Sequence, residues 1–134
     1  MYFTDSPTKN VFQYEFDSAT GSISNREVFF HVEDEGVPDG FAQDVNGCLW
    51  IAVCEGGKVL KVSPEGRLMG EVAMPTRWIT CPVFVGEELF VTSAEEEEPE
   101  KYPASVELGG SLFRVHVGVQ GMDVHHFRCQ RRLT

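Results

Sequence analysis

The chain has 134 residues, of which 42% are hydrophobic and 24% charged; this composition fits one globular domain and excludes wholesale disorder. Asp and Glu number 21 against 11 Lys and Arg, so the formal net charge is −10. A chain this acidic is a poor binder of nucleic acid or anionic membranes. No apolar run approaches the ~20 residues of a membrane helix, so we expect neither kind of partner.

The start of the chain and its cysteines indicate a cytoplasmic protein. The first five residues contain no basic segment followed by an apolar one, so no secretory signal is expected. The cysteines are Cys48, Cys54, Cys81 and Cys129, and none forms a C-x-x-C pair, which argues against structural zinc. We interpret them as reduced thiols, and the first three as small hydrophobic side chains in or beside strands. A disulfide or a redox role is the alternative.

Short β-rich segments separated by turn residues occupy most of the chain, and helical periodicity is nearly absent. In the second segment Phe12, Tyr14 and Phe16 alternate onto one face. Asn46-Gly47 is the strongest hairpin signal. The expected strands are residues 1–4, 11–16, 26–32, 41–45, 49–53, 59–62, 68–72, 79–85, 89–92 and 112–117. The predicted fold class is therefore all-β, with no helix.

The strands repeat along the chain. Similar strand–turn–strand patterns begin at Met1, Leu49 and Leu89, at spacings of 48 and 40 residues. A unit of ~40–50 residues with four short strands is typical of a β-propeller blade. The chain holds about three such units, whereas propellers close with roughly four to eight. We therefore expect a partial propeller, the C-terminal half of something larger or a chain completed by a partner, whose exposed blade faces favour self-association.

Nine short segments occur in an order and spacing that is specific as a set, although each alone is common. They are YFTDS at 2–6, VFQYEFD at 11–17, TGSISNR at 20–26, VPDGF at 37–41, DVNGCLWIA at 44–52, GGKV at 56–59, TCPVF at 80–84, LFVTSA at 89–94 and GGSLF at 109–113. This set resembles the gluconolactonase/regucalcin (SMP-30) family over residues 1–121. Residues 122–134 are then a C-terminal strand or tail.

The resemblance implies a six-bladed propeller and a metal-dependent hydrolase of sugar lactones or related cyclic esters. It also implies one divalent ion on the ring axis, Ca²⁺, Zn²⁺, Mn²⁺ or Mg²⁺, held by a Glu, an Asn and the Asp of a Pro-Asp-Gly loop. Only the Asp is present, as Asp39, and the other two ligands would lie upstream of Met1. One carboxylate cannot hold such an ion, which puts the activity of this chain alone in doubt. The alternative is a non-catalytic propeller fragment that serves as a binding or assembly module.

Asp39 is the strongest candidate site residue. Pro38 stiffens the approach, and Gly40 lets the backbone turn tightly and come close to a ligand. The family role implied for Asp39 is that of metal ligand and catalytic residue, the latter as general base toward a metal-activated water that attacks the lactone carbonyl. The structural alternative is an ordinary turn, because Pro-Asp-Gly is a common turn sequence.

Further candidates lie in the next repeat. Thr80 stands near the position that Asp39 holds in its own repeat, so we predict that it binds substrate at the same axial opening, against the alternative of an ordinary inter-blade loop. Arg77 is interpreted as a surface arginine, and the alternative is that it meets a polar substrate. The acidic run at 95–98 is predicted to be a solvated loop rather than a calcium site, because consecutive like charges repel.

The remaining histidines and tryptophans are given structural roles. His31 and His116 are interpreted as packing residues within strands, and Trp50 and Trp78 as core or blade-face aromatics. The pair at 125–126 is not expected to bind metal, because neighbouring residues on a strand point to opposite faces. Residues 130–134 form a short basic tail.

Overall fold

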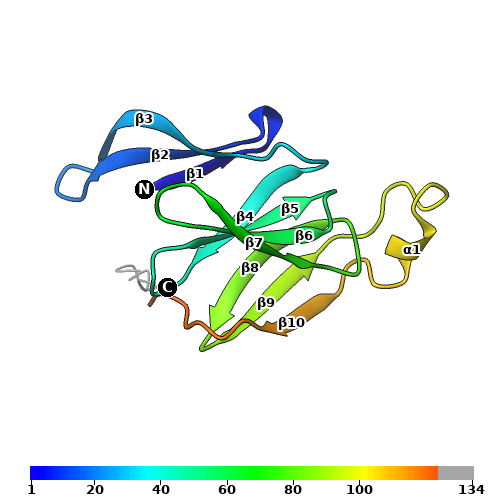
Figure 1. The fold of residues 1–134 in the computed structure, drawn as a ribbon. Helices are drawn as coiled ribbons and strands as arrows, with labels where there is room; N and C mark the ends of the chain where they lie inside the picture. Colours follow the sequence, from blue (N-terminus) through cyan, green and yellow to red (C-terminus); the bar gives the residue numbers. More distant parts are fainter. Residues whose placement is uncertain (124–134) are drawn as a thin grey trace, which may run out of the picture.

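The computed structural model describes residues 1–123, which form three antiparallel sheets in chain order (Figure 1). The strands are β1 (Tyr2–Asp5), β2 (Asn10–Asp17), β3 (Ser22–His31), β4 (Val37–Gln43), β5 (Leu49–Cys54), β6 (Lys58–Val62), β7 (Leu68–Ala73), β8 (Ile79–Val85), β9 (Glu88–Ser93) and β10 (Leu112–His116). Two helical turns accompany them, the 3-10 turn η1 (Ser6–Thr8) and α1 (Pro103–Val106). The all-β prediction is confirmed.

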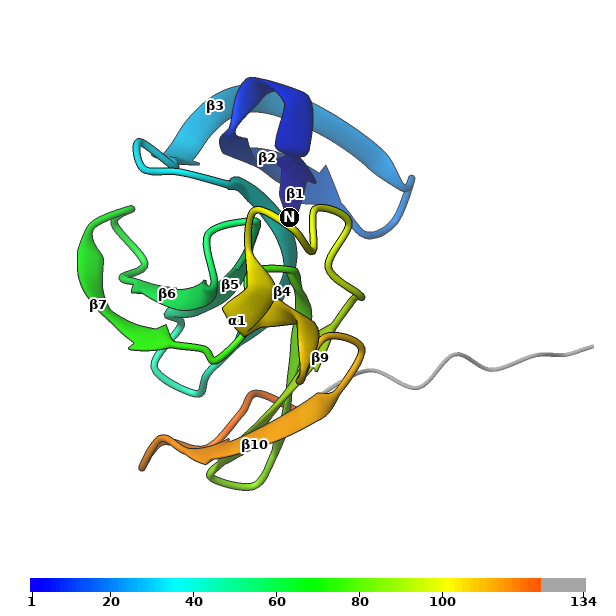
Figure 2. The same ribbon diagram turned by 90° about the vertical axis from the view of Figure 1, so that its right-hand side faces the viewer.

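Every sheet is a meander in which each strand pairs with the next. Sheet 1 contains β1–β2–β3, sheet 2 contains β4–β5–β6–β7 and sheet 3 contains β8–β9–β10. Sheet 2 lies between the other two (Figure 1). Strand β1 contacts β4, and β4 contacts β8, so the first strands of the three sheets gather at one edge from which the sheets fan out (Figure 2). This is the arrangement of neighbouring propeller blades, and it confirms the expected partial propeller.

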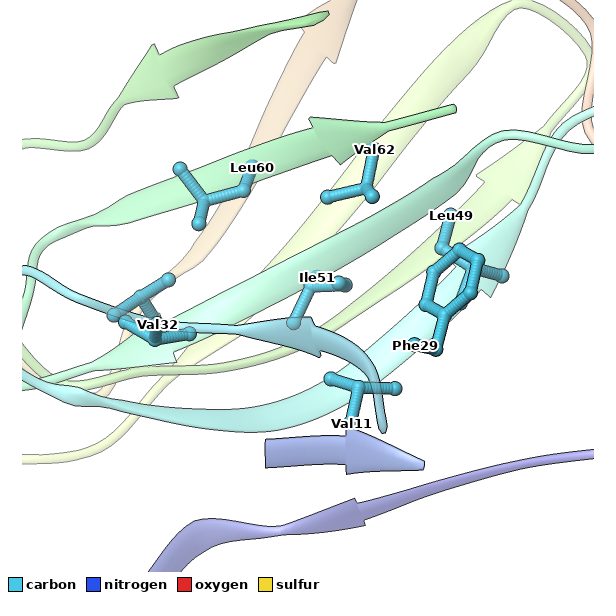
Figure 3. Close-up of a cluster of buried hydrophobic side chains, with 8 residues drawn as sticks. Val11, Phe29, Val32, Leu49, Ile51, Leu60 and Val62 are labelled. Atoms are coloured by element: carbon cyan, nitrogen blue, oxygen red, sulfur yellow. The ribbon is translucent and has the colours of Figure 1, made fainter. Parts of the chain in front are cut away.

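The core lies on both sides of sheet 2, which explains the sequence of β5. Leu49 and Ile51 pack toward Val11 and Phe29 of sheet 1 (Figure 3). Val53 belongs to the same cluster. The alternating residues Trp50 and Ala52 pack with Leu89 and Val91 of sheet 3. All six residues of β5 are buried, because a strand covered on both faces is apolar throughout instead of alternating. Each buried aliphatic side chain stabilises the fold by roughly 1.5–3 kcal/mol.

The Asn46-Gly47 turn is confirmed between β4 and β5, and a buried carboxylate orders it. Asp44 is inaccessible to solvent. Its Oδ1 accepts hydrogen bonds from the backbone N–H groups of Asn46 and Cys48, both at 3.0 Å. Its Oδ2 accepts one from Trp50 Nε1 at 3.0 Å. The turn therefore fixes the C-terminal end of β4 relative to the core.

The structure corrects two predictions of secondary structure. Strand β4 begins at Val37, so Pro38 and Asp39 lie within a strand and not in a loop. Proline is tolerated there because β4 is an edge strand with a register irregularity between Pro38 and Phe41. Helix α1 was not predicted, since four residues are too few to carry a helical period.

The predicted packing roles of two histidines are also wrong. His31 is exposed on β3, where its Nδ1 lies 2.9 Å from Asn10 Oδ1. His116 is exposed on β10, with Nδ1 3.3 Å from Glu88 Oε1. Both strands are outermost in three-stranded sheets, so alternate side chains face solvent.

The predictions for the pair at 125–126, for Cys129 and for the tail at 130–134 fall outside the described residues. Within residues 1–123 no helix is long and apolar enough to cross a bilayer.

Candidate functional site at Asp39

Asp39 lies near the start of β4, the strand of sheet 2 closest to sheets 1 and 3, and is half-buried. Pro38 is fully buried, and its carbonyl accepts a 2.7 Å hydrogen bond from Ser6 Oγ of η1. The carboxylate is therefore held on a strand that is fixed on both sides.

Gly40 is required for close packing and not for the expected tight turn, since its φ is not positive. A Cβ at this position would lie 2.7 Å from Cys81 Sγ and 2.8 Å from the Thr80 carbonyl oxygen. No real Cβ makes contacts this short. The absence of a side chain at Gly40 is what lets β4 and β8 approach each other beside Asp39.

Burial dominates the electrostatics of the site. It raises the pKa of Asp39, against the opposing effect of the Gly40 N–H. It also raises the pKa of Cys54 to about 11, with further contributions from the negative charges of Asp39 and Glu55. The pKa of Cys81 is raised by burial and then by Asp39. Both thiols are therefore protonated at neutral pH and are neither nucleophiles nor metal ligands in that state.

The cysteines of the described chain are free thiols. Cys48 and Cys54 are buried, in keeping with the expected hydrophobic packing. Cys81 is exposed instead, and its Sγ lies beside Gly40 of β4.

The backbone carbonyl of Thr80 lies next to Gly40. Its hydroxyl is 2.7 Å from Thr92 Oγ1 on β9. The side chain thus has a partner within sheet 3, and its predicted contact with substrate stays a prediction.

The 94–111 loop borders the same end of the sheets, and Glu96 ties it down. The Glu96 side chain is inaccessible to solvent. Its Oε1 accepts hydrogen bonds from Arg77 Nη1 at 2.9 Å and Trp78 Nε1 at 3.1 Å. Burial opposes the charged form, but the Glu98 N–H, the Ser105 hydroxyl, Trp78 and Arg77 outweigh it and lower the pKa of Glu96.

Two sequence predictions are therefore wrong in this region. Glu96 is not part of a solvated acidic loop, because its side chain is buried and its Oε1 accepts hydrogen bonds from Arg77 and Trp78. Arg77 is not a surface arginine: its side chain is 15% exposed and its guanidinium carbon lies 3.4 Å from the centre of the Tyr102 ring. Arg77 Nη2 is also 3.6 Å from Glu55, which follows Cys54 and so links the loop to the surroundings of Asp39.

A cavity of about 690 Å³ extends along β4 and β8 toward the end opposite Asp39. Its walls are mainly apolar and include Phe41, Val83 and Phe84. The segment 117–123 closes one side, since Met122 N–H donates to the Gln43 carbonyl and Gly121 N–H to the Gly86 carbonyl. Cys81 lines the cavity, whereas Asp39 and Thr80 do not.

Within the described chain, the residues around Asp39 do not make a complete metal site. No three His, Cys, Asp or Glu side chains between residues 1 and 123 come together as metal ligands. Asp39 offers one hard oxygen ligand of the kind that Ca²⁺, Mg²⁺ and Mn²⁺ prefer. A cation there would need further oxygen ligands beside Asp39.

Comparison with known proteins gives a consistent result. Residues 1–95 match the family described as "SMP-30/Gluconolactonase/LRE-like region". The chain is 36% identical to 6-deoxy-6-sulfogluconolactonase of Pseudomonas putida over 125 residues, which are 90% of this chain and 43% of that protein. It therefore spans less than half the length of the curated relatives it matches.

Solved structures match the fold over the same extent. A luciferin-regenerating enzyme superposes with a TM-score of 0.81 at 34% identity, covering 91% of this chain and 43% of that one. A structure described as the calcium-binding protein regucalcin from Agrobacterium tumefaciens gives a TM-score of 0.76 at 28% identity, covering 90% and 42%. The three sheets correspond to part of a six-bladed propeller. The chain therefore belongs to the SMP-30/gluconolactonase/regucalcin family.

Proposed function

We propose that this chain contributes to a metal-dependent hydrolase of sugar lactones, in which Asp39 is a ligand of a divalent cation. The observation that carries the proposal is the position of Asp39. It is a half-buried carboxylate on the strand nearest the meeting edge of the sheets, at the Pro-Asp-Gly sequence. The Pseudomonas relative is by name a lactonase, and the Agrobacterium structure is described as that of a calcium-binding protein. Both support this assignment.

The residues around Asp39 suit the role of an oxygen ligand. Burial disfavours the bare carboxylate, and a nearby cation reverses that preference. The Gly40 N–H favours the charged form of the carboxylate and so opposes the effect of burial on its pKa. Because no three His, Cys, Asp or Glu side chains of the described residues gather as metal ligands, we expect activity only in a complete ring, whether with Ca²⁺, Zn²⁺, Mn²⁺ or Mg²⁺.

Hydrolysis of δ-gluconolactone, followed by acid release in a pH-stat with each cation in turn, tests the proposal. We expect Asp39→Asn to lower the metal-dependent rate by more than about 100-fold, because loss of even an outer partner of a metal site costs 10–100-fold. Asp17→Asn, at the exposed end of β2, is the matched control and should keep the wild-type rate. Equal rates for Asp39→Asn and wild type would refute the role of Asp39.

A binding or assembly module is the second candidate function. It is favoured by the exposed apolar side chains on the outer sheets, among them Phe3 and Val28 of sheet 1 and Val83 and Leu112 of sheet 3. If the wild-type chain shows no metal-dependent hydrolysis in any oligomeric state, this second candidate replaces the first.

A further inference from the structure

The 94–111 loop lies at the end of the sheets where β5 ends and β4 begins (Figure 1). Two buried side chains of the loop attach it to the segment that precedes β8. Ser105 Oγ accepts a 2.9 Å hydrogen bond from the backbone N–H of Arg77, and the Ser105 carbonyl accepts one of 3.1 Å from Thr76 Oγ1. Glu96 Oε1 accepts a 2.9 Å hydrogen bond from Arg77 Nη1. The loop therefore holds Arg77 by its backbone and by its side chain.

The guanidinium of Arg77 is shared among three partners. Its carbon lies 3.4 Å from the centre of the Tyr102 ring, which covers one face of the group. Nη1 donates to Glu96, and Nη2 lies 3.6 Å from Glu55 Oε2. This arrangement uses the planar fork of arginine, which the single ammonium of lysine lacks. It is the environment of an arginine that connects parts of the protein to each other.

Arg77 connects the loop to the turn that follows β5. The Arg77 carbonyl accepts a 3.1 Å hydrogen bond from the Gly57 N–H, and the next residue, Trp78, pairs with Cys54 in an isolated β-bridge. Glu55 is a non-glycine residue with a φ of 66°. A side chain in this left-handed conformation persists only where its surroundings hold it. Its ion pair with Arg77 is one such contact.

The end of β5 in turn supports the start of β4. The first two residues of β4, Val37 and Pro38, pair with the last two residues of β5. The register is irregular after Pro38, so Asp39 has no regular partner on β5. The position of Asp39 therefore depends on the pairing of the two residues before it, and this pairing depends on where the end of β5 is held.

We propose that Arg77 is a positioning residue for Asp39, because it holds the end of β5 between the 94–111 loop and the start of β4. Arg77 acts through the backbone of residues 54–57 and not on the Asp39 carboxylate itself. The inference deepens the proposed function, and its consequence for hydrolysis rests on the metal-binding role of Asp39. The support that Arg77 gives to the start of β4 does not rest on that role.

Amide hydrogen exchange of the metal-free full chain, followed by NMR, tests this support. Arg77→Lys keeps the positive charge but loses the fork. We expect the amides of residues 37–41 and 53–55 to exchange about 10-fold faster or more, because they open locally, while those of residues 59–61 in the centre of sheet 2 keep their wild-type rates.

A milder variant and a matched control accompany it. Glu55 has a side chain that is 43% exposed, so Glu55→Gln should fold normally and remove only the link from Arg77 to the turn. We expect about two- to five-fold faster exchange at residues 37–41, since exposed ion pairs contribute little. Glu71→Gln, which removes a half-exposed partner of Lys58 at 3.2 Å, should leave these rates unchanged.

Two exchange results would overturn the proposal. Equal acceleration at residues 37–41 and 59–61 would mean that Arg77 stabilises only the fold as a whole. Wild-type rates at residues 37–41 in both Arg77→Lys and Glu55→Gln would mean that Arg77 does not hold β4.

The hydrolysis assay with δ-gluconolactone supplies a second measurement. In Arg77→Lys the cation concentration for half-maximal rate should rise several-fold while the KM for the lactone stays unchanged, because Arg77 acts on the metal ligand. A rise in KM alone would show that Arg77 contacts the substrate and would overturn the positioning role. Absence of hydrolysis in the wild type would count against the proposed function alone, since the exchange rates are measured without metal and decide the role of Arg77.

Discussion

Asp39 carries its charge at an energetic cost to the fold. Its folded-state pKa lies above the ordinary value of 3.8 because burial disfavours the carboxylate. Asp39→Asn should therefore raise the melting temperature slightly at pH 7. The difference should shrink as the pH falls through the folded-state pKa and vanish below 3.8, where both states of the wild type are protonated. Thermal unfolding between pH 3 and 8 checks this, and a variant less stable than the wild type at pH 7 would contradict it.

Gly40 should be far less replaceable than a glycine in open space. In Gly40→Ala the new methyl group would lie 2.8 Å from the Thr80 carbonyl oxygen, and β4 would have to move away from β8. We expect a loss of about 1–3 kcal/mol of unfolding free energy, typical of overpacking. Gly70→Ala on β7, where a Cβ meets nothing within 4 Å, is the matched control. Urea unfolding curves compare the two, and equal midpoints would contradict the close packing.

The sequence around Asp39 and Gly40 predicted Asp39 as a candidate site residue, but it did not predict that both residues lie in a strand. Pro-Asp-Gly is typical of turns, so residues 37–40 looked like a loop. The chain instead runs through them as an edge strand, where Pro38 needs no ladder partner and Gly40 fits against Cys81. The contact that requires a glycine at position 40 comes from Cys81, about 40 positions further along the chain. No local sequence pattern contains both residues.

Among the elements, β5 was predicted well and the 94–111 loop was not. The unbroken apolar run from Leu49 to Cys54 between turn residues matches a strand buried on both faces. In the loop, the acidic run gave no sign that one of its members is buried, because its partner Arg77 lies 19 residues away. An arginine and two aromatic residues, Trp78 and Tyr102, flanking the acidic run are the signal that could have suggested a buried ion pair.

The attachment of this loop can be tested at Glu96. Glu96→Gln removes the negative charge that Arg77 and Trp78 face, so the loop should open more often. We expect several-fold faster tryptic cleavage after Lys101, the exposed lysine of the loop. Glu97→Gln, at an exposed neighbour, should cleave at the wild-type rate. Similar rates for all three proteins would show that Glu96 does not hold the loop.

At the scale of the whole molecule, the repeat in the sequence predicted the number of blades correctly. Strand patterns beginning at Met1, Leu49 and Leu89 correspond to the three sheets. The same pattern does not tell which residues cover the outer faces of sheets 1 and 3. An apolar strand face needs the same kind of sequence whether the blade that covers it belongs to the same chain or to another chain.

The two tryptophans lie at two different joints of the molecule. Trp50 packs edge-on against Phe84, with ring centres 5.9 Å apart, where sheets 2 and 3 meet. Trp78 donates to Glu96, where the 94–111 loop is attached. Since the chain has no other tryptophan, its own ultraviolet emission contains one signal for each joint. Replacing either indole by phenylalanine would leave a label-free optical reporter that follows blade separation or loop release alone.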